Sequence, residues 1–167
     1  LSAKLTEVLR KRFTSTNEDT FPGFIATLIS GRVANYFNCN GINFIIDSAS
    51  TSSAIAISSA ITSLKQHDLD YVITGGVDSN LTPSVLHGFK SWGLLSDQNT
   101  PLSKEANGFC LGEGAALFVL TTYKNALINN QKILAELNDF SFYNDPHTSI
   151  TTPNQKAYQK AQNNLYN

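Results

Sequence analysis

Small and hydroxyl-bearing side chains fill residues 47–53, directly after the apolar run Phe44-Ile45-Ile46. A short apolar run between turn signals predicts a buried strand, and apolar residues at helical spacing over residues 54–64 predict a helix after the segment. A tight turn between a strand and a helix exposes one side chain at the bend. The helix N-terminus behind that side chain favours developing negative charge. This arrangement suits a nucleophile.

The same segment has a second interpretation, because serine and threonine are also good helix-capping residues. Residues 48–53 could simply satisfy the free N–H groups at the start of the predicted helix. Helix caps are also far commoner than nucleophile turns. From these residues alone, both interpretations stay open.

The other side chains with reactive groups are scattered along the chain. They are His67, His87, His147, Cys39 and Cys110. None of the histidines has a neighbouring group that would orient it as a catalytic base. The spacing matches no metal-binding pattern, so we expect no metal. No dinucleotide fingerprint is present either, so we expect no cofactor.

Hydrophobic periodicity predicts an alternation of helices and strands. The predicted helices cover residues 2–13, 22–36, 54–64, 84–92, 123–128 and 155–166. The predicted strands cover residues 44–46, 71–74, 109–120 and 133–137. Such an alternation is typical of an α/β fold whose sheet is mostly covered. No low-complexity linker divides the chain, so we expect residues 1–167 to form one domain or part of one.

Length, charge and composition exclude several classes of function. The 167 residues carry a net charge of −1 with a pI near 6.3, which gives no electrostatic reason to bind nucleic acid or an anionic membrane. No apolar stretch approaches the roughly 20 residues that cross a bilayer. Two lone cysteines suit a reducing cytosol, where such residues behave as small buried hydrophobes, so we expect a cytoplasmic protein. The chain has no methionine, and we expect it to be excised from a longer one.

Four short segments follow one another in an order that a known family shares. They are residues 30–35, 47–53, 72–78 and 108–115. Together they resemble the β-ketoacyl synthases, or ketosynthases, of the thiolase-like superfamily, over about residues 21–142. In the second segment, the family has an aspartate and two small residues before a nucleophilic cysteine, and Ser50 takes the cysteine position. Phe21-Pro22-Gly23 favours the polyketide or polyunsaturated-fatty-acid synthase type.

This resemblance implies a fold, a reaction and partners. The fold would be the layered αβαβα arrangement, of which this chain supplies mainly the N-terminal half. The reaction would be decarboxylative Claisen condensation by an acyltransferase, with Ser50 as the acyl attachment point and an apolar pocket that includes Thr51, Phe89 and Trp92. The partners would be an acyl carrier protein with acyl and malonyl phosphopantetheine thioesters, the rest of the ketosynthase domain, and a second subunit in a homodimer or heterodimer.

The chain departs from the family pattern at three places. Serine at position 50 needs an adjacent base, and its oxygen ester is a poorer acyl donor than a thioester. The two family histidines, which lie beyond the glycine-rich segment, are absent. Residues 100–103 lack the charged and aromatic residues of the family loop, and Asn107 stands where an aspartate is common. We therefore expect impaired condensation and no activity from this chain alone.

Three functions are compatible with this pattern. The first is part of a condensing enzyme with serine in the nucleophile position. The second is a non-catalytic subunit that resembles a chain-length factor, lacks the cysteine and shapes the acyl tunnel of a heterodimer. The third is a serine esterase or thioesterase, which lacks support because the Gly-x-Ser-x-Gly motif and a paired histidine are missing. The first is our expectation, and the second is the alternative.

Overall fold

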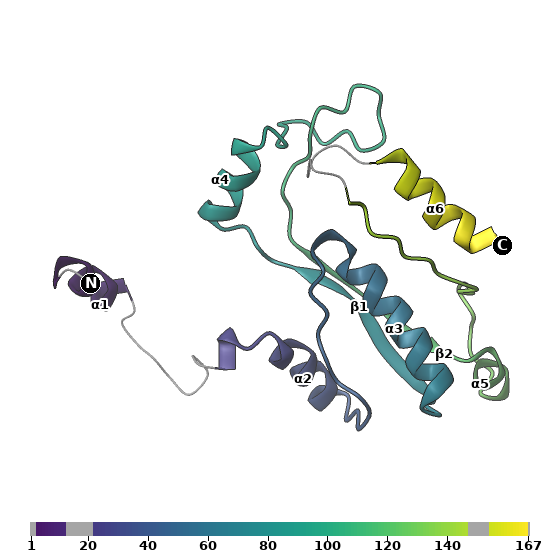
Figure 1. The fold of residues 1–167 in the computed structure, drawn as a ribbon. Coiled ribbons are helices and arrows are strands. Elements are labelled where there is room, and N and C mark those ends of the chain that lie inside the picture. The colour runs from purple at the N-terminus through teal and green to yellow at the C-terminus, as the bar shows by residue number, and fades with distance from the viewer. Residues whose placement is uncertain (1–2, 13–21, 147–153, 167) are drawn as a thin grey trace. The chain divides into compact units, whose positions relative to one another are not determined.

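The computed structural model describes residues 3–12, 22–146 and 154–166 (Figure 1). Its helices and strands are, in chain order, α1 (Ala3–Arg12), α2 (Thr27–Tyr36), α3 (Ser52–Gln66), β1 (Tyr71–Asp78), α4 (Pro83–Ser91), β2 (Gly114–Thr121), α5 (Tyr123–Ile128) and α6 (Gln155–Tyr166). Short 3₁₀ turns at Pro22–Phe24 and Ala49–Thr51 precede α2 and α3. Helices and strands therefore alternate through the middle of the chain, as the sequence predicts.

The chain divides into two compact units, and each contains segments distant in sequence. One unit comprises Leu1–Ile57 and Thr74–Phe118, and the other comprises Ser58–Ile73 and Val119–Asn167. α3, β1 and β2 each contribute residues to both units. The turn that carries Ser50 belongs to the first unit, and α5 belongs to the second.

β1 and β2 pair as a two-stranded antiparallel sheet. At one end, the Thr121 hydroxyl donates to the Asp70 carbonyl oxygen over 2.6 Å. Further along, Gly75 lies opposite Ala116, where a Cβ atom on the glycine would be 2.1 Å from the carbonyl oxygen. Residue numbers rise in one strand as they fall in the other, which makes the pairing antiparallel. Gly75, with a φ of +154°, lets the two backbones approach this closely.

Two predicted strands are wrong, and a third starts later than expected. Neither residues 44–46 nor residues 133–137 form a strand, because within the described ranges they join no hydrogen-bonded ladder. β2 begins at Gly114 rather than at Phe109, which makes only an isolated parallel bridge with Leu95. Apolar side chains alone do not make a strand, since its backbone groups need a neighbouring strand.

The predicted helices are confirmed, with shifts at their ends. The helix predicted over residues 22–36 is divided, because Pro22 opens a 3₁₀ turn and α2 begins only at Thr27. α4 and α5 each begin after a threonine that caps the helix. Thr82 accepts a hydrogen bond from the Val85 N–H, and Thr122 accepts one from the Asn125 N–H.

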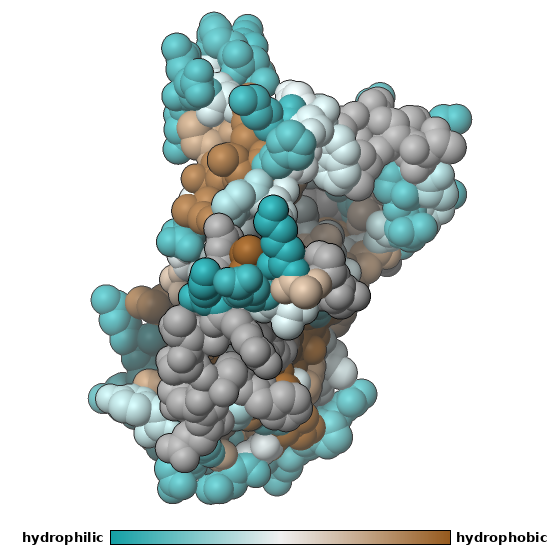
Figure 2. Space-filling view, turned by 90° about the vertical axis from the view of Figure 1, so that its left-hand side faces the viewer, coloured by the Kyte–Doolittle hydropathy of each residue, from teal (hydrophilic) through white to brown (hydrophobic). Residues whose placement is uncertain are grey.

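Few side chains are buried, and large apolar ones lie on the surface. The buried hydrophobic residues in the described ranges are Ala60, Ala126 and Ala157. In β2, successive residues Leu117, Phe118 and Val119 are 56%, 54% and 67% exposed, so both faces of the strand are open. Figure 2 shows such apolar residues on the surface among polar ones.

Both cysteines differ from the sequence expectation. Cys39 and Cys110 are exposed free thiols, not buried hydrophobes. The Cys110 thiol donates to the Ser96 carbonyl oxygen over 3.0 Å. In the part of the chain that the structure describes, no helix has the length and apolar character to cross a membrane.

Candidate functional site

Ser50 lies in the middle of a 3₁₀ turn that leads directly into α3. The turn covers Ala49–Thr51, and α3 begins at the next residue, Ser52. The Ser50 side chain is exposed, and no hydrogen bond to its hydroxyl is found in the described residues. A reagent can therefore reach this hydroxyl, which lies at the N-terminal end of a 15-residue helix.

The residue before Ser50 has a backbone conformation that side chains rarely adopt. Ala49 has a φ of +49°, in the left-handed region. For an L-residue this conformation costs about 1–2 kcal/mol. Strain of this kind is often found at functional sites, where the surrounding structure holds it in place. Here the positive φ belongs to the first residue of the 3₁₀ turn that contains the exposed Ser50.

Hydroxyl groups within the turn hold this bend closed. Ser52 Oγ accepts a hydrogen bond from the Ser48 N–H over 2.8 Å and donates to the Ala49 carbonyl oxygen over 2.6 Å. Thr51 Oγ1 donates to the Ser48 carbonyl oxygen over 2.8 Å. The Ala49 N–H donates to Asp47 Oδ1 over 3.3 Å. Ser48 occupies the N-cap position without a side-chain capping bond, so these contacts brace the turn and differ from a simple helix cap.

The histidines do not assist Ser50 in this arrangement. His67 and His87 are exposed, and neither makes a hydrogen bond to Ser50 in the ranges that the structure covers. His147 lies outside the described residues. The same ranges hold no cluster of three or more histidine, cysteine, aspartate or glutamate side chains that could bind a metal ion.

The aromatic residues predicted to line an acyl pocket form a separate cluster. The ring of Phe89 packs edge-on against Trp92, with centroids 6.0 Å apart, and against Phe109, with centroids 5.1 Å apart. Phe89 is half-buried, whereas Trp92 is 54% exposed. Phe89 therefore has a packing role here, and Trp92 presents the larger free surface. The Thr51 hydroxyl is engaged with the Ser48 carbonyl oxygen.

The loop that follows α4 is closed by polar contacts. Ser96 Oγ donates to Asn107 Oδ1 over 2.7 Å. The Asn107 amide oxygen thus provides an acceptor of the kind that an aspartate would offer, without its charge. Further along the loop, the Ser103 hydroxyl donates to the Glu105 carboxylate and, together with the backbone, lowers the pKa of that exposed carboxyl group.

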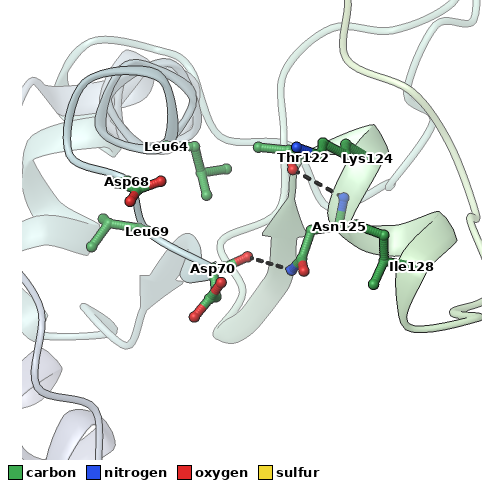
Figure 3. A pocket seen from close by; sticks show the side chains of 8 residues that line it. All are labelled: Leu64, Asp68, Leu69, Asp70, Thr122, Lys124, Asn125 and Ile128. Carbon is green, nitrogen blue, oxygen red and sulfur yellow. Dashed lines mark hydrogen bonds between the residues drawn. The ribbon is translucent and has the colours of Figure 1, made fainter.

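A pocket of about 250 Å³ lies beside the start of β1 and α5 (Figure 3). Its lining residues are Leu64, Asp68, Leu69, Asp70, Thr122, Lys124, Asn125 and Ile128. The Asn125 amide donates to the Asp70 carbonyl oxygen over 3.1 Å, and the Asn125 N–H donates to Thr122. The pocket includes none of the predicted site residues.

Sequence reasoning located the turn but missed what supports it. The strained φ of Ala49 has no sequence signal, because alanine is not a typical left-handed residue. The sequence also does not show that Ser52 makes the bracing hydrogen bonds, because the residues around it carry hydroxyl groups as well. The close contact of Gly76, in β1, with Ser53 of α3 has no sequence signal either, because the two residues are distant in the chain.

Comparison with known proteins identifies a family and a fold. The profile of the β-ketoacyl synthase N-terminal domain matches residues 4–126. A non-reducing polyketide synthase of Penicillium brevicompactum is 31% identical over 156 residues, which make up 92% of this chain and 7% of the synthase. One polypeptide of a polyunsaturated fatty acid synthase from Thraustochytrium sp. is 29% identical over 164 residues, or 96% of this chain and 6% of that polypeptide.

A solved structure supports the same assignment of the fold. It is described as a type II polyketide synthase acyl-carrier protein in complex with its ketosynthase bound to the hexaketide. The match has a TM-score of 0.77 and 20% identity, and it covers 87% of this chain and 38% of the solved chain. At this identity the likeness establishes the shared fold. The present chain spans only a small part of the synthases and less than half of the solved chain.

Proposed function

We propose that this chain, which belongs to the family of β-ketoacyl synthase N-terminal domains, holds the acyl group of a ketosynthase on Ser50. Its fold is that of the N-terminal portion of the thiolase-like ketosynthases, and its relatives include polyketide and polyunsaturated fatty acid synthases. The observation that carries the proposal is an exposed Ser50 next to a residue with positive φ, at the start of α3.

The proposed step is transfer of an acyl group from a thioester to residue 50. The Ser50 oxygen attacks the acyl carbonyl, a new carbon–oxygen bond forms, and the carbon–sulfur bond breaks. The released thiolate takes up the proton that the hydroxyl loses. Backbone N–H groups at the start of α3 favour the negative charge that develops on the carbonyl oxygen.

Serine in this position slows both the loading and the use of the acyl group. A hydroxyl is a weak nucleophile without an adjacent base, whereas a thiol is a few per cent thiolate at neutral pH. The oxygen ester is then a poorer acyl donor to the carbanion that forms when a malonyl group loses carbon dioxide. Impaired condensation follows from these two effects together.

The acyl donor in this proposal is the phosphopantetheine thioester of an acyl carrier protein. Its support is the solved relative that is described as a ketosynthase in complex with such a carrier. The rest of a ketosynthase domain would supply the histidines that decarboxylation requires, and a second subunit would complete a dimer. Thr51, Phe89 and Trp92 are proposed to line the acyl pocket, with Trp92 offering the largest free apolar surface.

A chain-length-factor-like subunit is the second candidate function. Two features favour it: the Ser50 hydroxyl lacks a hydrogen-bonded base in the described ranges, and Asn107 makes an uncharged contact where the family commonly has an aspartate. Such a subunit would form a stable heterodimer with a competent ketosynthase. Co-purification of the two proteins, compared with each alone, separates this function from the first.

The test of the proposed function is to restore the thiol. In the full-length protein, Ser50→Cys should raise malonyl decarboxylation and condensation well above the levels of the natural protein. The reason is that a cysteine can take up the acyl group as a thioester, which is a better acyl donor than an oxygen ester. Ser50→Ala is the matched control and should lose acyl loading. If Ser50→Cys gains neither activity, the acyl-holding function is wrong, and heterodimer formation becomes the decisive observation.

A further inference from the structure

The first turn of α3 lies close to β1 and leaves little room for a side chain opposite Ser53. A Cβ atom at Gly76 would lie 2.2 Å from Ser53 Oγ and 3.1 Å from Ser53 Cβ. Both distances are shorter than a relaxed non-bonded contact of about 3.5–4.0 Å. The φ of Gly76 is outside the left-handed region, so the close contact with Ser53, and not the backbone conformation, favours glycine at this position.

The neighbouring glycine has a different role. A Cβ atom at Gly75 would lie 2.1 Å from the Ala116 carbonyl oxygen and 2.9 Å from the Leu117 Cα, and its φ is +154°. Those contacts are with the backbone of β2, so Gly75 is needed for pairing of the two strands. Gly76 instead faces a side chain of α3. Gly75 therefore lies at the contact between β1 and β2, whereas Gly76 lies at the contact between β1 and the first turn of α3.

We propose that Gly76 is a positioning residue for the turn that carries Ser50. The absence of a side chain allows Ser53 to lie against β1, and this contact sets how close the first turn of α3 comes to the sheet. Ser50 lies three residues before Ser53, about one helical turn away. Between them, Ser52 is hydrogen-bonded to Ser48 and Ala49, the two residues that precede Ser50. A larger residue at position 76 would displace Ser53 and move residue 50 with it. This inference rests on the proposed role of Ser50.

The contact between residues 76 and 53 can be made tighter and then relieved in steps, because the two atoms nearest to the added Cβ, Oγ and Cβ, both belong to Ser53. Gly76→Ala introduces the clash with the hydroxyl. Adding Ser53→Ala removes Oγ and leaves the Cβ contact at 3.1 Å, and adding Ser53→Gly instead leaves only the Cα at 3.9 Å. Gly114→Ala is the matched control, since Gly114 is also a strand glycine but nothing lies within 4 Å of its added Cβ.

The experiment uses the full-length protein with Ser50→Cys as the parent and measures the rate of acyl transfer from an acyl carrier thioester to residue 50. Gly76→Ala should lower this rate at least about tenfold, because small displacements of a reacting group are costly. The double variant of Gly76→Ala with Ser53→Ala should have an intermediate rate of acyl transfer. The double variant with Ser53→Gly should have a rate within about twofold of the parent rate. Gly114→Ala should leave the rate unchanged.

Far-ultraviolet circular dichroism and the midpoint of thermal unfolding serve as the folding control and should be the same in every variant. Alkylation of Cys39 and Cys110 by iodoacetamide, followed by mass spectrometry, is the control for general thiol reactivity, because both thiols are exposed. The alkylation rates of these two thiols should also be the same in every variant. An unchanged acylation rate in Gly76→Ala, or failure of Ser53→Gly to restore it, would overturn the inference. If Gly76→Ala fails to fold, the milder double variant with Ser53→Ala provides the same comparison. A parent that is never acylated would contradict the proposed function instead.

Discussion

At the scale of single residues, Ala49 has a strained backbone conformation immediately before the exposed Ser50. Its φ of +49° is an unfavourable conformation for alanine and an ordinary one for glycine. Two hydroxyl groups, those of Thr51 and Ser52, hold the carbonyl oxygens on either side of this residue. The turn therefore stores backbone strain and resists it with hydrogen bonds, as nucleophile turns do.

Substitution of Ala49 by glycine should stabilise this turn. Removal of about 1–2 kcal/mol of strain outweighs the greater entropy of glycine in the unfolded chain, which leaves a gain of about 0.5–1 kcal/mol. Hydrogen exchange of the Ser48 N–H, which is bonded to Ser52, should slow about two- to fivefold.

Two further variants calibrate this prediction. Ala49→Val should accelerate the same exchange, because a β-branched residue fits positive φ poorly. Ala56→Gly, in the regular helix α3, should weaken its own part of the helix by about 1 kcal/mol. An Ala49→Gly variant that exchanges faster than the natural protein would show that the backbone at position 49 is not strained.

At the scale of secondary structure, the helices could be predicted from hydrophobic periodicity along the sequence. In the structure, Thr82 and Thr122 cap α4 and α5, and each threonine hydroxyl accepts a hydrogen bond from a backbone N–H of the first turn. Helices are recognisable because their hydrogen bonds and caps are local in sequence. The predicted strand at residues 44–46 fails for the opposite reason, since pairing depends on residues that are distant in the chain.

The two capping threonines give a paired prediction. Thr122→Ala should destabilise α5 by about 1 kcal/mol and raise hydrogen exchange in residues 123–128 about fivefold. The effect should extend to the contact between Asn125 and Asp70, since the cap orders Asn125. Thr82→Ala should act in the same way on α4 alone, so each variant is the control for the other. Equal hydrogen-exchange rates of residues 123–128 in the natural protein and in Thr122→Ala would contradict a capping role of Thr122.

The candidate site illustrates the same limit of sequence reasoning. The position of Ser50 on a turn before a helix follows from local pattern, and the structure has that turn. The contact between Ser53 and Gly76 involves residues 23 positions apart, so no local pattern predicts it. Whether Phe89 and Trp92 line an acyl pocket also depends on distant packing, and it stays a prediction.

At the scale of the whole molecule, the exposed apolar residues need a covering surface. Leu117, Phe118 and Val119 lie open on both faces of β2, and exposed patches of this kind mark sites of association. The chain also spans only 38% of the solved ketosynthase chain that it matches. A ketosynthase remainder, or a second subunit, would provide the covering surface in our proposal.

Residues 1–167 produced alone should therefore bind the dye ANS and associate as their concentration rises. Phe118→Ser should reduce the association, because it removes an apolar side chain that is 54% exposed on the sheet. Leu102→Ser is the control, since Leu102 is also exposed but lies in the loop away from the strands. Sedimentation velocity measures the association. A fragment that stays monomeric at high concentration and binds no dye would contradict this view of the surface.

The most direct test of the central claim is to locate the acyl group itself. Full-length protein with Ser50→Cys is incubated with an acylated carrier protein, digested and analysed by mass spectrometry. We expect an acyl group on residue 50 and none on Cys39 or Cys110, although both of these thiols are also exposed. Acylation that is equal at all three cysteines, or absent from residue 50, would contradict it.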